Sequence, residues 1–316
     1  MPASLPLVLI ADPIDPAAAQ QLAGGSCRVV DASAGGPALE PYLGEAWALV
    51  VRSRTKVTSE LLARAPQLRI IARAGVGVDN VDLAEASRRR IRVVNAPTAA
   101  TQSVAELTVA LMLLLVRGLY PSIAATKGGS WNRGTHGHEL AGRTVGFVGY
   151  GRIARETRSR LRNFGVTVLA HDPFLASSPD GTVLLPLPEL LARSEIVSLH
   201  AALTEQNRHL MNADRIGRMP RGSYLLNVAR GALVDEEALL AALDSGHLGG
   251  AALDVFEVEP PTRTALLQHP RVIPTPHLGA STVEAQARAG VHVAEELLRA
   301  LRQEPLLYQV NPEVSA

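Results

Sequence analysis

The sequence predicts an α/β protein built from doubly wound parallel sheets, and three observations support this fold class. Short apolar runs of strand length alternate with segments of helical periodicity along most of the chain. This alternation is typical of β–α–β units, in which helices cover both faces of a parallel sheet. The length of 316 residues suggests about two domains. Hydrophobic residues make up 47% of the chain, which is enough for large cores, but aromatic residues make up only 3%. Ala, Val, Leu and Ile must therefore do most of the packing.

The first hundred residues contain five apolar runs with strand composition. We expect strands at Leu5–Ile10, Ser26–Val30, Ala48–Val51, Leu68–Ala72 and Ile91–Val94. Helical patterns predict helices at Pro16–Ala23, Thr58–Ala65 and Val81–Arg90. Ser53 and the glycine turn at 75–77 directly follow two of the strands. Ligands of parallel sheets bind outside the carboxyl ends of the strands, so both positions are candidates for a binding site.

The middle and the end of the chain continue the alternation after a linker at 95–98. A long apolar helix is expected at Gln102–Tyr120, buried in a core or in a subunit interface, and a loop at 128–134 follows it. Further strands are predicted at Val145–Val148, Val166–Ala170, Glu195–His200, Leu225–Val228, Ala251–Val255 and Val272–Thr275. Two more helices are expected at Glu236–Ser245 and Val283–Arg302.

The stretch from Arg143 to Asp172 has the order strand, glycine turn, helix, strand and acid. Its turn, Gly149-Tyr150-Gly151-Arg152-Ile153-Ala154, matches G-x-G-x-x-G/A, with Ala154 as a mild departure at the last position. Gly149 allows the tight turn, and Gly151 lets a pyrophosphate approach the backbone at the N-terminus of the helix. A lone glycine turn is weak evidence, but here its whole context agrees. The stretch therefore predicts a dinucleotide-binding β–α–β unit.

The choice of dinucleotide depends on Asp172 at the end of the second strand. A carboxylate there accepts hydrogen bonds from an adenosine ribose and repels a 2′-phosphate, which favours NAD. The nearby Arg152 leaves NADP as an alternative.

Composition excludes several other classes of protein. The 31 basic and 30 acidic residues give a net charge of +1, so no basic excess indicates a nucleic-acid-binding protein. The single cysteine, Cys27, rules out an intramolecular disulfide and a cysteine metal cluster, and we expect no metal site. The N-terminus has no basic region before its short apolar run, and Val109–Val116 is far shorter than a membrane span. We therefore expect a cytoplasmic protein without a membrane partner.

Three later stretches place polar side chains at the ends of predicted strands. Arg230 follows one strand, Asp254 to Glu259 follow another, and His277 follows a third. Each has a plain alternative: Arg230 could pair with Asp235, and the glutamates could be solvated surface residues. Because strand ends meet at one edge of a doubly wound sheet, an arginine, a carboxylate and a histidine could also converge there.

Such a set suits the oxidation of a 2-hydroxy acid. A base must take the hydroxyl proton while a hydride leaves C2 for a nicotinamide, and imidazole ordinarily titrates near neutrality. A carboxylate next to an imidazole orients the ring and favours its protonated form. An arginine holds carboxylate and carbonyl oxygens in a planar fork.

Together these stretches resemble the D-isomer-specific 2-hydroxyacid dehydrogenase family, and most of all its D-3-phosphoglycerate dehydrogenases. The resemblance covers nearly the whole chain, in the order VRSRTKVT, RAGVGVDNVDL, the glycine turn, NVARGALVDEEAL, GAALDVFEVEPP and PHLGAST. It implies a flavodoxin-like substrate domain at 1–98 plus 288–316 and a Rossmann NAD domain at 99–287. It also implies a homodimer, with the helix at 102–120 in the interface.

The resemblance implies a role for each matching residue. His277 would be the acid/base, Glu259 rather than Glu257 its partner, and Arg230 a substrate ligand. Substrate would also be held by Ser53, Val76 and Gly77. The implied cofactor-binding residues are Gly149, Gly151, Arg152, Ile153, Asp172, Val228, Asp254, His277, Gly279 and Ala280.

The implied activity is the NAD-dependent interconversion of a D-2-hydroxy acid and its 2-keto acid. The leading substrate pair is 3-phosphoglycerate and 3-phosphohydroxypyruvate, with Arg52, Arg54, Lys56 and Arg133 as candidate phosphate ligands. Glyoxylate or hydroxypyruvate reduction remains an alternative, as does a non-catalytic NAD(H)-sensing protein similar to the corepressors of this family. A formate dehydrogenase shares the fold, but Glu259 argues against it.

Two features of the chain depart from the family pattern. His200-Ala201-Ala202-Leu203 lacks the proline of the usual H-x-P-L motif, which affects the expected adenine pocket. The chain stops near Asn311, so we expect no C-terminal regulatory domain and no feedback control by serine through one.

Overall fold

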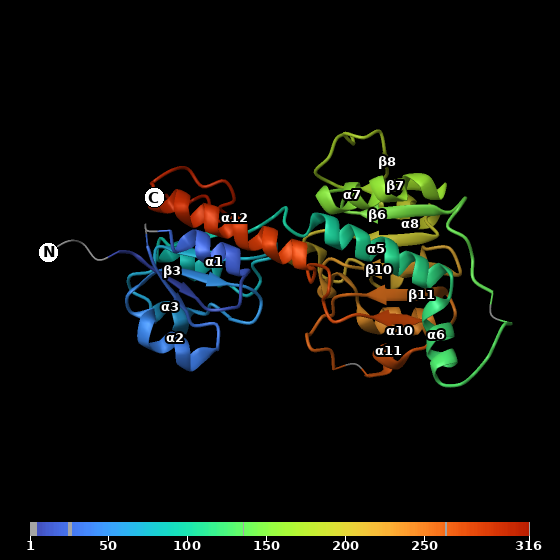
Figure 1. Ribbon diagram of the computed structural model, residues 1–316. Helices are drawn as coiled ribbons and strands as arrows, with labels where there is room; N and C mark the ends of the chain where they lie inside the picture. Colours follow the sequence, from blue (N-terminus) through green and yellow to red (C-terminus); the bar gives the residue numbers. More distant parts are fainter. Residues whose placement is uncertain (1–4, 25–26, 135, 263, 316) are drawn as a thin grey trace. The chain divides into compact units, whose positions relative to one another are not determined.

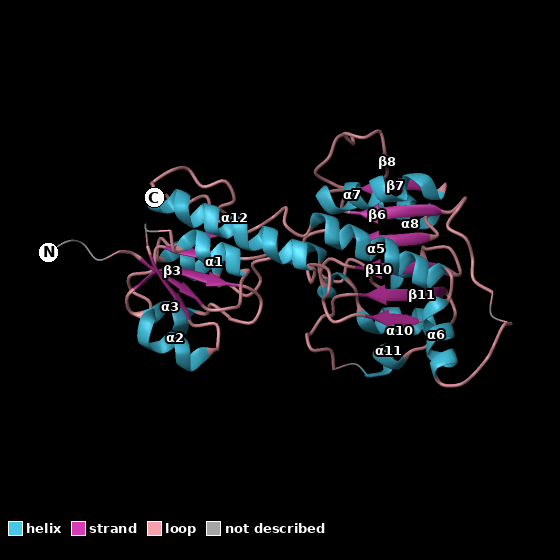
Figure 2. Cartoon of the chain, viewed as in Figure 1, coloured by secondary structure: helices cyan, strands magenta, loops and turns pink. Residues whose placement is uncertain are grey.

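The computed structural model describes residues 5–24, 27–134, 136–262 and 264–315. The chain divides into two compact units, Met1–Ala100 with Ala280–Ala316 (unit 1) and Thr101–Gly279 (unit 2). Figure 1 follows the chain through both units, and Figure 2 shows that each combines helices with a sheet. The predicted α/β class is confirmed, because every strand pair within the two sheets is parallel.

Unit 1 is built on a five-stranded sheet with the order β2-β1-β3-β4-β5. Its strands are β1 (Leu7–Ile10), β2 (Arg28–Asp31), β3 (Ala46–Val51), β4 (Ile70–Arg73) and β5 (Arg92–Val94). All four residues of β1 are buried, as expected for an inner strand that is covered on both faces. The expected start of β2 at Ser26 lies outside the described residues.

Helices cover both faces of the unit 1 sheet. Its helices are α1 (Pro16–Leu22), α2 (Gly36–Leu43), α3 (Ser59–Ala63), α4 (Leu83–Arg88) and α12 (Val283–Leu301). Apolar residues of α1 and α12 pack on one face, and those of α2, α3 and α4 pack on the other. Caps set the helix starts: Asp15 accepts a hydrogen bond from the Ala17 N–H, and Asp82 accepts one from the Glu85 N–H, both at 2.9 Å.

Unit 2 is built on a seven-stranded sheet with the order β12-β11-β10-β9-β6-β7-β8. Its strands are β6 (Thr144–Val148), β7 (Thr167–His171), β8 (Val183–Leu184), β9 (Ile196–Leu199), β10 (Ser223–Asn227), β11 (Leu248–Leu253) and β12 (Val272–Pro274). The chain first runs outward from β6 to β8 and then returns to place β9 on the other side of β6. The gap between β6 and β9 is therefore the switch point, where doubly wound sheets bind ligands.

The unit 2 helices also lie on two faces. They are α5 (Thr101–Val116), α6 (Leu119–Lys127), α7 (Arg152–Leu161), α8 (Leu187–Arg193), α9 (Ala213–Gly217), α10 (Glu236–Asp244) and α11 (Thr264–Gln268), with short 3-10 turns η1 (Arg162–Phe164), η2 (Glu205–Asn207) and η3 (Gly231–Leu233). Helices α8 to α11 supply apolar residues to one core cluster, and α5 packs against α7. Among the described residues, no single helix is long and apolar enough to cross a membrane; α5 and α6 pass such a test only as a pair, bent by 72°.

The long helix predicted at 102–120 is wrong in one respect, because the structure breaks it into α5 and α6. Gly118 lies between them with a φ of 58°. This left-handed conformation is favourable for glycine and ends a right-handed helix. The helices α2, α8, α9 and α11 and the strand β8 were not predicted from the sequence; each is no longer than eight residues.

Candidate active site

The glycine turn of unit 2 leaves β6 at the switch point. Gly149 has a φ of 87°, and its N–H donates to the carbonyl of His171 at 2.8 Å. A Cβ at this position would lie 2.7 Å from the backbone nitrogen of Ala201, which follows β9. Both its backbone conformation and the close approach of the next strand therefore require glycine here.

Gly151 differs from Gly149 because the space around it is open. It is the N-cap of α7 with a φ of −80°, and a Cβ there would have no heavy atom within 4 Å. Ala154 is buried in the first turn of α7, whereas Arg152 is exposed and Ile153 is half-buried. The first N–H groups of α7 thus border open space, which suits an anion such as a pyrophosphate.

Asp172 follows β7 and is hydrogen-bonded to the glycine turn. Its Oδ2 accepts from the Tyr150 N–H at 2.9 Å, and its Oδ1 accepts from the Phe174 N–H at 3.0 Å. The carboxylate therefore ties the end of β7 to the turn that follows β6. Each oxygen still has lone-pair capacity for the hydroxyl groups of a ribose.

Sequence reasoning missed the role of Tyr150 inside the glycine turn. Its side chain is buried, and its hydroxyl lies 2.9 Å from Asp180 Oδ2 and 2.7 Å from Thr182 Oγ1. Burial is the main cause that raises the pKa of Tyr150 to about 12. The buried, neutral phenol of Tyr150 thus fixes the glycine turn to Asp180 and Thr182. The pattern G-x-G does not encode these contacts.

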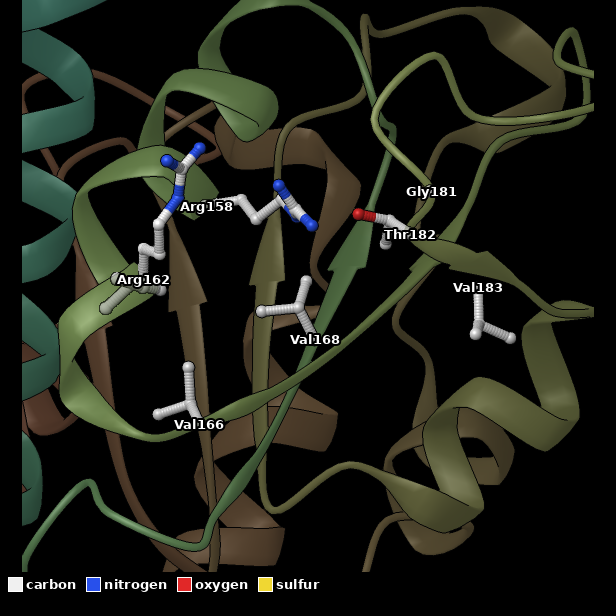
Figure 3. Close-up of a pocket in the computed structure, with 8 residues that line it drawn as sticks. Arg158, Arg162, Val166, Val168, Gly181, Thr182 and Val183 are labelled. Carbon is white, nitrogen blue, oxygen red and sulfur yellow. The ribbon is translucent and has the colours of Figure 1, made fainter.

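A hollow of about 230 Å³ beside α7 and β7 is separate from the residues predicted to bind a dinucleotide. It is lined by Arg158, Leu161, Arg162, Val166, Val168, Gly181, Thr182 and Val183. In Figure 3 the side chain of Arg158 points toward Thr182, and Arg158 also lies 3.6 Å from Asp180. Arg158 thus helps to hold the segment that contacts Tyr150.

Asp254, at the end of β11, organises the turn that carries His277. Its Oδ1 accepts from the Thr275 hydroxyl at 2.6 Å and from the Leu278 N–H at 2.7 Å, and its Oδ2 accepts from the Gly279 N–H at 2.8 Å. Asp254 is 1% exposed. This carboxylate holds the turn after β12 in place, a role that the sequence did not suggest.

His277 and Glu259 are brought together by this arrangement. The Nδ1 atom of His277 lies 2.9 Å from Glu259 Oε2, and both side chains are partly exposed. Glu259 Oε1 accepts from the Phe256 N–H at 3.2 Å, so both carboxylate oxygens are used. With Nδ1 engaged, Nε2 is the ring atom available for proton transfer.

The neighbouring Glu257 contacts a different histidine. Its Oε1 lies 3.0 Å from His209 Nε2 and also pairs with Arg208. Its backbone N–H donates to Glu236 Oε1 at 2.8 Å. The segment after β11 thus carries two glutamates that each contact a histidine from another loop, and the histidine that contacts Glu259 follows β12.

Arg230 follows β10, the strand next to β11. Its carbonyl accepts from Asn227 Nδ2 at 2.8 Å, and its side chain is half-buried. The next residue, Gly231, lies so close to Phe256 that a Cβ would come within 1.8 Å of the Phe256 carbonyl carbon. This contact fixes the arginine turn against the segment that leads to Glu259.

The remaining predicted cofactor residues lie near these turns. Val228 is buried directly after β10, and Gly279 is buried beside Asp254 and Val104 of α5. Ala280 is exposed and is the first residue of the second part of unit 1.

The predicted substrate residues belong to unit 1. Ser53 is exposed in the segment after β3, and Val76 and Gly77 are half-buried after β4. The buried Asn95 donates through Nδ2 to the Val76 carbonyl at 2.6 Å. All three residues therefore lie at the carboxyl ends of neighbouring strands of the unit 1 sheet.

Comparisons with known proteins show which family the chain resembles. The family described as "D-isomer specific 2-hydroxyacid dehydrogenase, NAD binding domain" matches residues 109–279. The D-3-phosphoglycerate dehydrogenase of Bacillus subtilis is 45% identical over 268 residues, which are 84% of this chain and 51% of that protein. The chain spans about half the length of the curated relatives that it matches first.

Solved structures are similar over nearly the whole chain. A glyoxylate reductase from Paecilomyes thermophila is 30% identical with a TM-score of 0.89, covering 99% of this chain and 100% of that one. An NAD-dependent formate dehydrogenase from Staphylococcus aureus in complex with NAD is 31% identical with a TM-score of 0.85, covering 96% and 97%.

Proposed function

The chain belongs to the D-isomer specific 2-hydroxyacid dehydrogenase family, whose NAD-binding domain it contains, and we propose that it interconverts a D-2-hydroxy acid and its 2-keto acid. The observation that carries the proposal is the contact between His277 Nδ1 and Glu259 Oε2 at 2.9 Å. It lies at the same edge of the sheet as the glycine turn, since β6 and β12 belong to one parallel sheet. A proton donor and acceptor is thus available at the sheet edge that carries the glycine turn.

Each residue of this edge has a role in the proposed reaction. NAD, when bound, supplies or accepts the hydride at C2 of the substrate. His277 gives its Nε2 proton to the carbonyl oxygen during reduction and takes it back during oxidation. Glu259 orients the imidazole ring through its contact with Nδ1. Arg230 holds the substrate carboxylate or carbonyl oxygen through its planar guanidinium group.

The residues of the glycine turn fit NAD. Gly151 leaves room for the pyrophosphate at the N-terminus of α7, and Gly149 brings the turn against the segment after β9. The Asp172 carboxylate binds the ribose hydroxyls and disfavours a 2′-phosphate. We infer that NADH is preferred over NADPH.

We propose unit 1 as the substrate domain and 3-phosphohydroxypyruvate as the leading substrate. Arg52, Arg54 and Lys56 surround the exposed Ser53 in sequence and give this segment a positive charge. The curated relatives named D-3-phosphoglycerate dehydrogenase support this choice. The structural likeness to a glyoxylate reductase supports glyoxylate or hydroxypyruvate as the second candidate.

We also propose that the protein is a cytoplasmic homodimer. In α6, none of the residues is buried, and Tyr120 and Ile123 are 43% and 51% exposed. Trp131 in the following segment is 81% exposed. Such apolar exposure fits a surface that a second copy covers. The buried Cys27 is a free thiol, which fits a reducing compartment.

A substrate panel tests the proposed function. The purified protein is mixed with NADH or NADPH and with 3-phosphohydroxypyruvate, hydroxypyruvate, glyoxylate and pyruvate, and cofactor oxidation is followed. The proposal predicts NADH oxidation with at least one of them, fastest with the phosphorylated acid. NADH binding without any turnover would instead support a sensor of the NADH level.

A further inference from the structure

The segment 52–55 after β3 is held through its backbone by a side chain from another loop. Asp12 follows β1, and its Oδ2 accepts from the Arg52 N–H at 2.7 Å and from the Thr55 N–H at 3.1 Å. Its Oδ1 accepts from the Thr55 hydroxyl at 2.6 Å. One carboxylate thus binds both ends of a four-residue segment.

Asn80, in the loop after β4, binds the same two residues through their carbonyl groups. Its Nδ2 donates to the Arg52 carbonyl at 2.8 Å and to the Thr55 carbonyl at 2.6 Å. Its own carbonyl accepts from the Val57 N–H at 2.8 Å. The N–H and C=O groups of Arg52 and Thr55 are therefore all occupied, the N–H groups by Asp12 and the C=O groups by Asn80.

The Asp12 carboxylate is committed to this arrangement. Its side chain is 1% exposed, and burial by itself disfavours the charged form. Hydrogen bonds from Thr55 and Arg52, together with the charge of Arg54 at 3.4 Å, outweigh burial and lower the pKa of Asp12. A buried carboxylate that lost these donors would be left unsatisfied, which is unfavourable. The segment is therefore strongly biased toward one conformation.

Ser53 lies between the two fixed residues, and its side chain is exposed. Asn80 also belongs to the loop that begins with the turn at Val76 and Gly77. We propose that Asp12 and Asn80 are positioning residues for the substrate: they hold Ser53 in a preorganised position and keep the segment after β3 in register with the loop after β4. This inference rests on the proposed function, because it needs these two segments to bind the substrate.

Kinetics of Asp12→Asn and Asn80→Ala test the inference. A preorganised segment lowers the cost of binding, so each variant should raise KM for the best 2-keto acid by about tenfold or more. The value of kcat should change by less than about threefold, and the Kd for NADH should stay the same, since the chemistry and the dinucleotide turn lie in unit 2. In a double-mutant cycle, Ser53→Ala should cost less in the Asp12→Asn background than in the wild type, because the two residues act together.

Two further variants distinguish a local effect on substrate binding from a loss of folding. Thr55→Val removes only the hydroxyl that donates to Asp12 and should raise KM by about twofold to fivefold, in line with one lost hydrogen bond. Asp31→Asn is the matched control, because Asp31 is exposed and accepts from the Ser33 N–H at 2.9 Å. It should leave KM unchanged.

The possible outcomes distinguish a failure of the positioning role from a failure of the proposed function. If the wild type turns over a keto acid and all the variants at Asp12, Asn80 and Thr55 keep its KM, the positioning role is overturned while the proposed function stands. A fall in kcat with unchanged KM would also overturn it, since that pattern indicates a general structural role. A wild type without turnover on any keto acid overturns both.

Discussion

His277 Nδ1 lies 2.9 Å from Glu259 Oε2, while 3.0 Å separates His209 Nε2 from Glu257 Oε1 on the same segment after β11. Both pairs join an imidazole nitrogen to a carboxylate oxygen, but different contacts hold the two histidines in place. His277 belongs to the turn that Asp254 holds through Thr275, Leu278 and Gly279. Only this pair follows β12 directly, and it is the one to which we assign proton transfer.

His277→Ala should lower kcat by about 100-fold or more, as expected for the loss of a general acid/base. Glu259→Gln keeps the size of the side chain but removes its charge, and should lower kcat by about tenfold or more. Steady-state kinetics with bound NADH confirmed by fluorescence would measure both. The matched control is His209→Ala, which should stay within about threefold of the wild type; an equal loss in this variant would contradict the assignment.

Gly151→Ala should weaken NADH binding without loss of stability. The backbone at Gly151 allows alanine, and no atom lies within 4 Å of the added methyl group. The free energy of unfolding should therefore change by less than about 1 kcal/mol, whereas the Kd for NADH should rise by about tenfold or more because the methyl group takes the place of the pyrophosphate. Gly44→Ala, at a similarly open glycine in unit 1, is the control. Unchanged NADH affinity in Gly151→Ala would exclude this turn as the pyrophosphate site.

Asp172→Asn should reduce the preference for NADH over NADPH. The amide oxygen can still accept from the Tyr150 N–H, now 2.9 Å from Asp172 Oδ2, so the turn should remain in place. The loss of negative charge removes the repulsion of a 2′-phosphate, and the ratio of kcat/KM for the two cofactors should move toward NADPH by about tenfold. A ratio equal to that of the wild type would show that another residue selects the cofactor.

Arg52→Gln should distinguish between candidate substrates. Arg52 precedes the exposed Ser53, and its guanidinium contacts the Pro13 carbonyl at 3.4 Å. If a phosphate binds here, KM for 3-phosphohydroxypyruvate should rise by about tenfold or more, while KM for glyoxylate should change little. Arg64→Gln, which removes an arginine paired with Glu40, serves as the control. Equal effects on both substrates would argue against a phosphate site at Arg52.

His200 should make stability depend on pH in the weakly acidic range. Desolvation lowers the pKa of His200 from 6.5 to about 3. Between these values the unfolded chain binds a proton and the folded chain does not, so the free energy of unfolding falls as the pH drops from 6.5 toward 3. The contribution of the neutral imidazole to the free energy of unfolding is fully present above pH 6.5. Below this pH it is lost at about 1.36 kcal/mol for each pH unit, which sums to a few kcal/mol.

Chemical denaturation of the wild type and of His200→Gln at several values between pH 5 and 7 measures this effect. The variant cannot bind the proton, so its stability should fall less steeply below pH 6.5. Parallel curves for the two proteins would contradict a neutral His200 in the folded protein.

The sequence predicts the long periodic elements of this fold well, and its helix break and shortest helices poorly. The unit from β6 through Gly149 and α7 to β7 is readable because period, turn residues and the terminal acid Asp172 all agree. The helix break at Gly118 cannot be predicted from the sequence, because a single glycine in an apolar helical pattern is compatible with a continuous helix. Tertiary packing determines whether the helix breaks there. Elements such as α9 and α11, of five residues each, are too short for a periodic signal.

In the candidate site, too, local motifs could be predicted from the sequence and contacts between distant residues could not. His277, Glu259 and Arg230 could be predicted as site residues because each follows a predicted strand in a recognisable motif. The hydrogen bonds of Asp254 to the turn after β12, and of Tyr150 to Asp180 and Thr182, join residues that are 21 to 32 positions apart in sequence. Such contacts depend on how loops meet in space, and no local pattern encodes them.

The central claim is hydride transfer between NADH and C2 of a 2-keto acid, and isotope transfer tests it most directly. NADH carrying deuterium at the transferable C4 position is mixed with the best keto acid of the panel, and the product is examined by mass spectrometry and chiral chromatography. Our proposal predicts that the deuterium is recovered at C2 of a D-2-hydroxy acid, and that His277→Ala forms this product at least about 100-fold more slowly. Deuterium that stays on the bound nicotinamide with every keto acid, or that appears in an L-hydroxy acid, would contradict it.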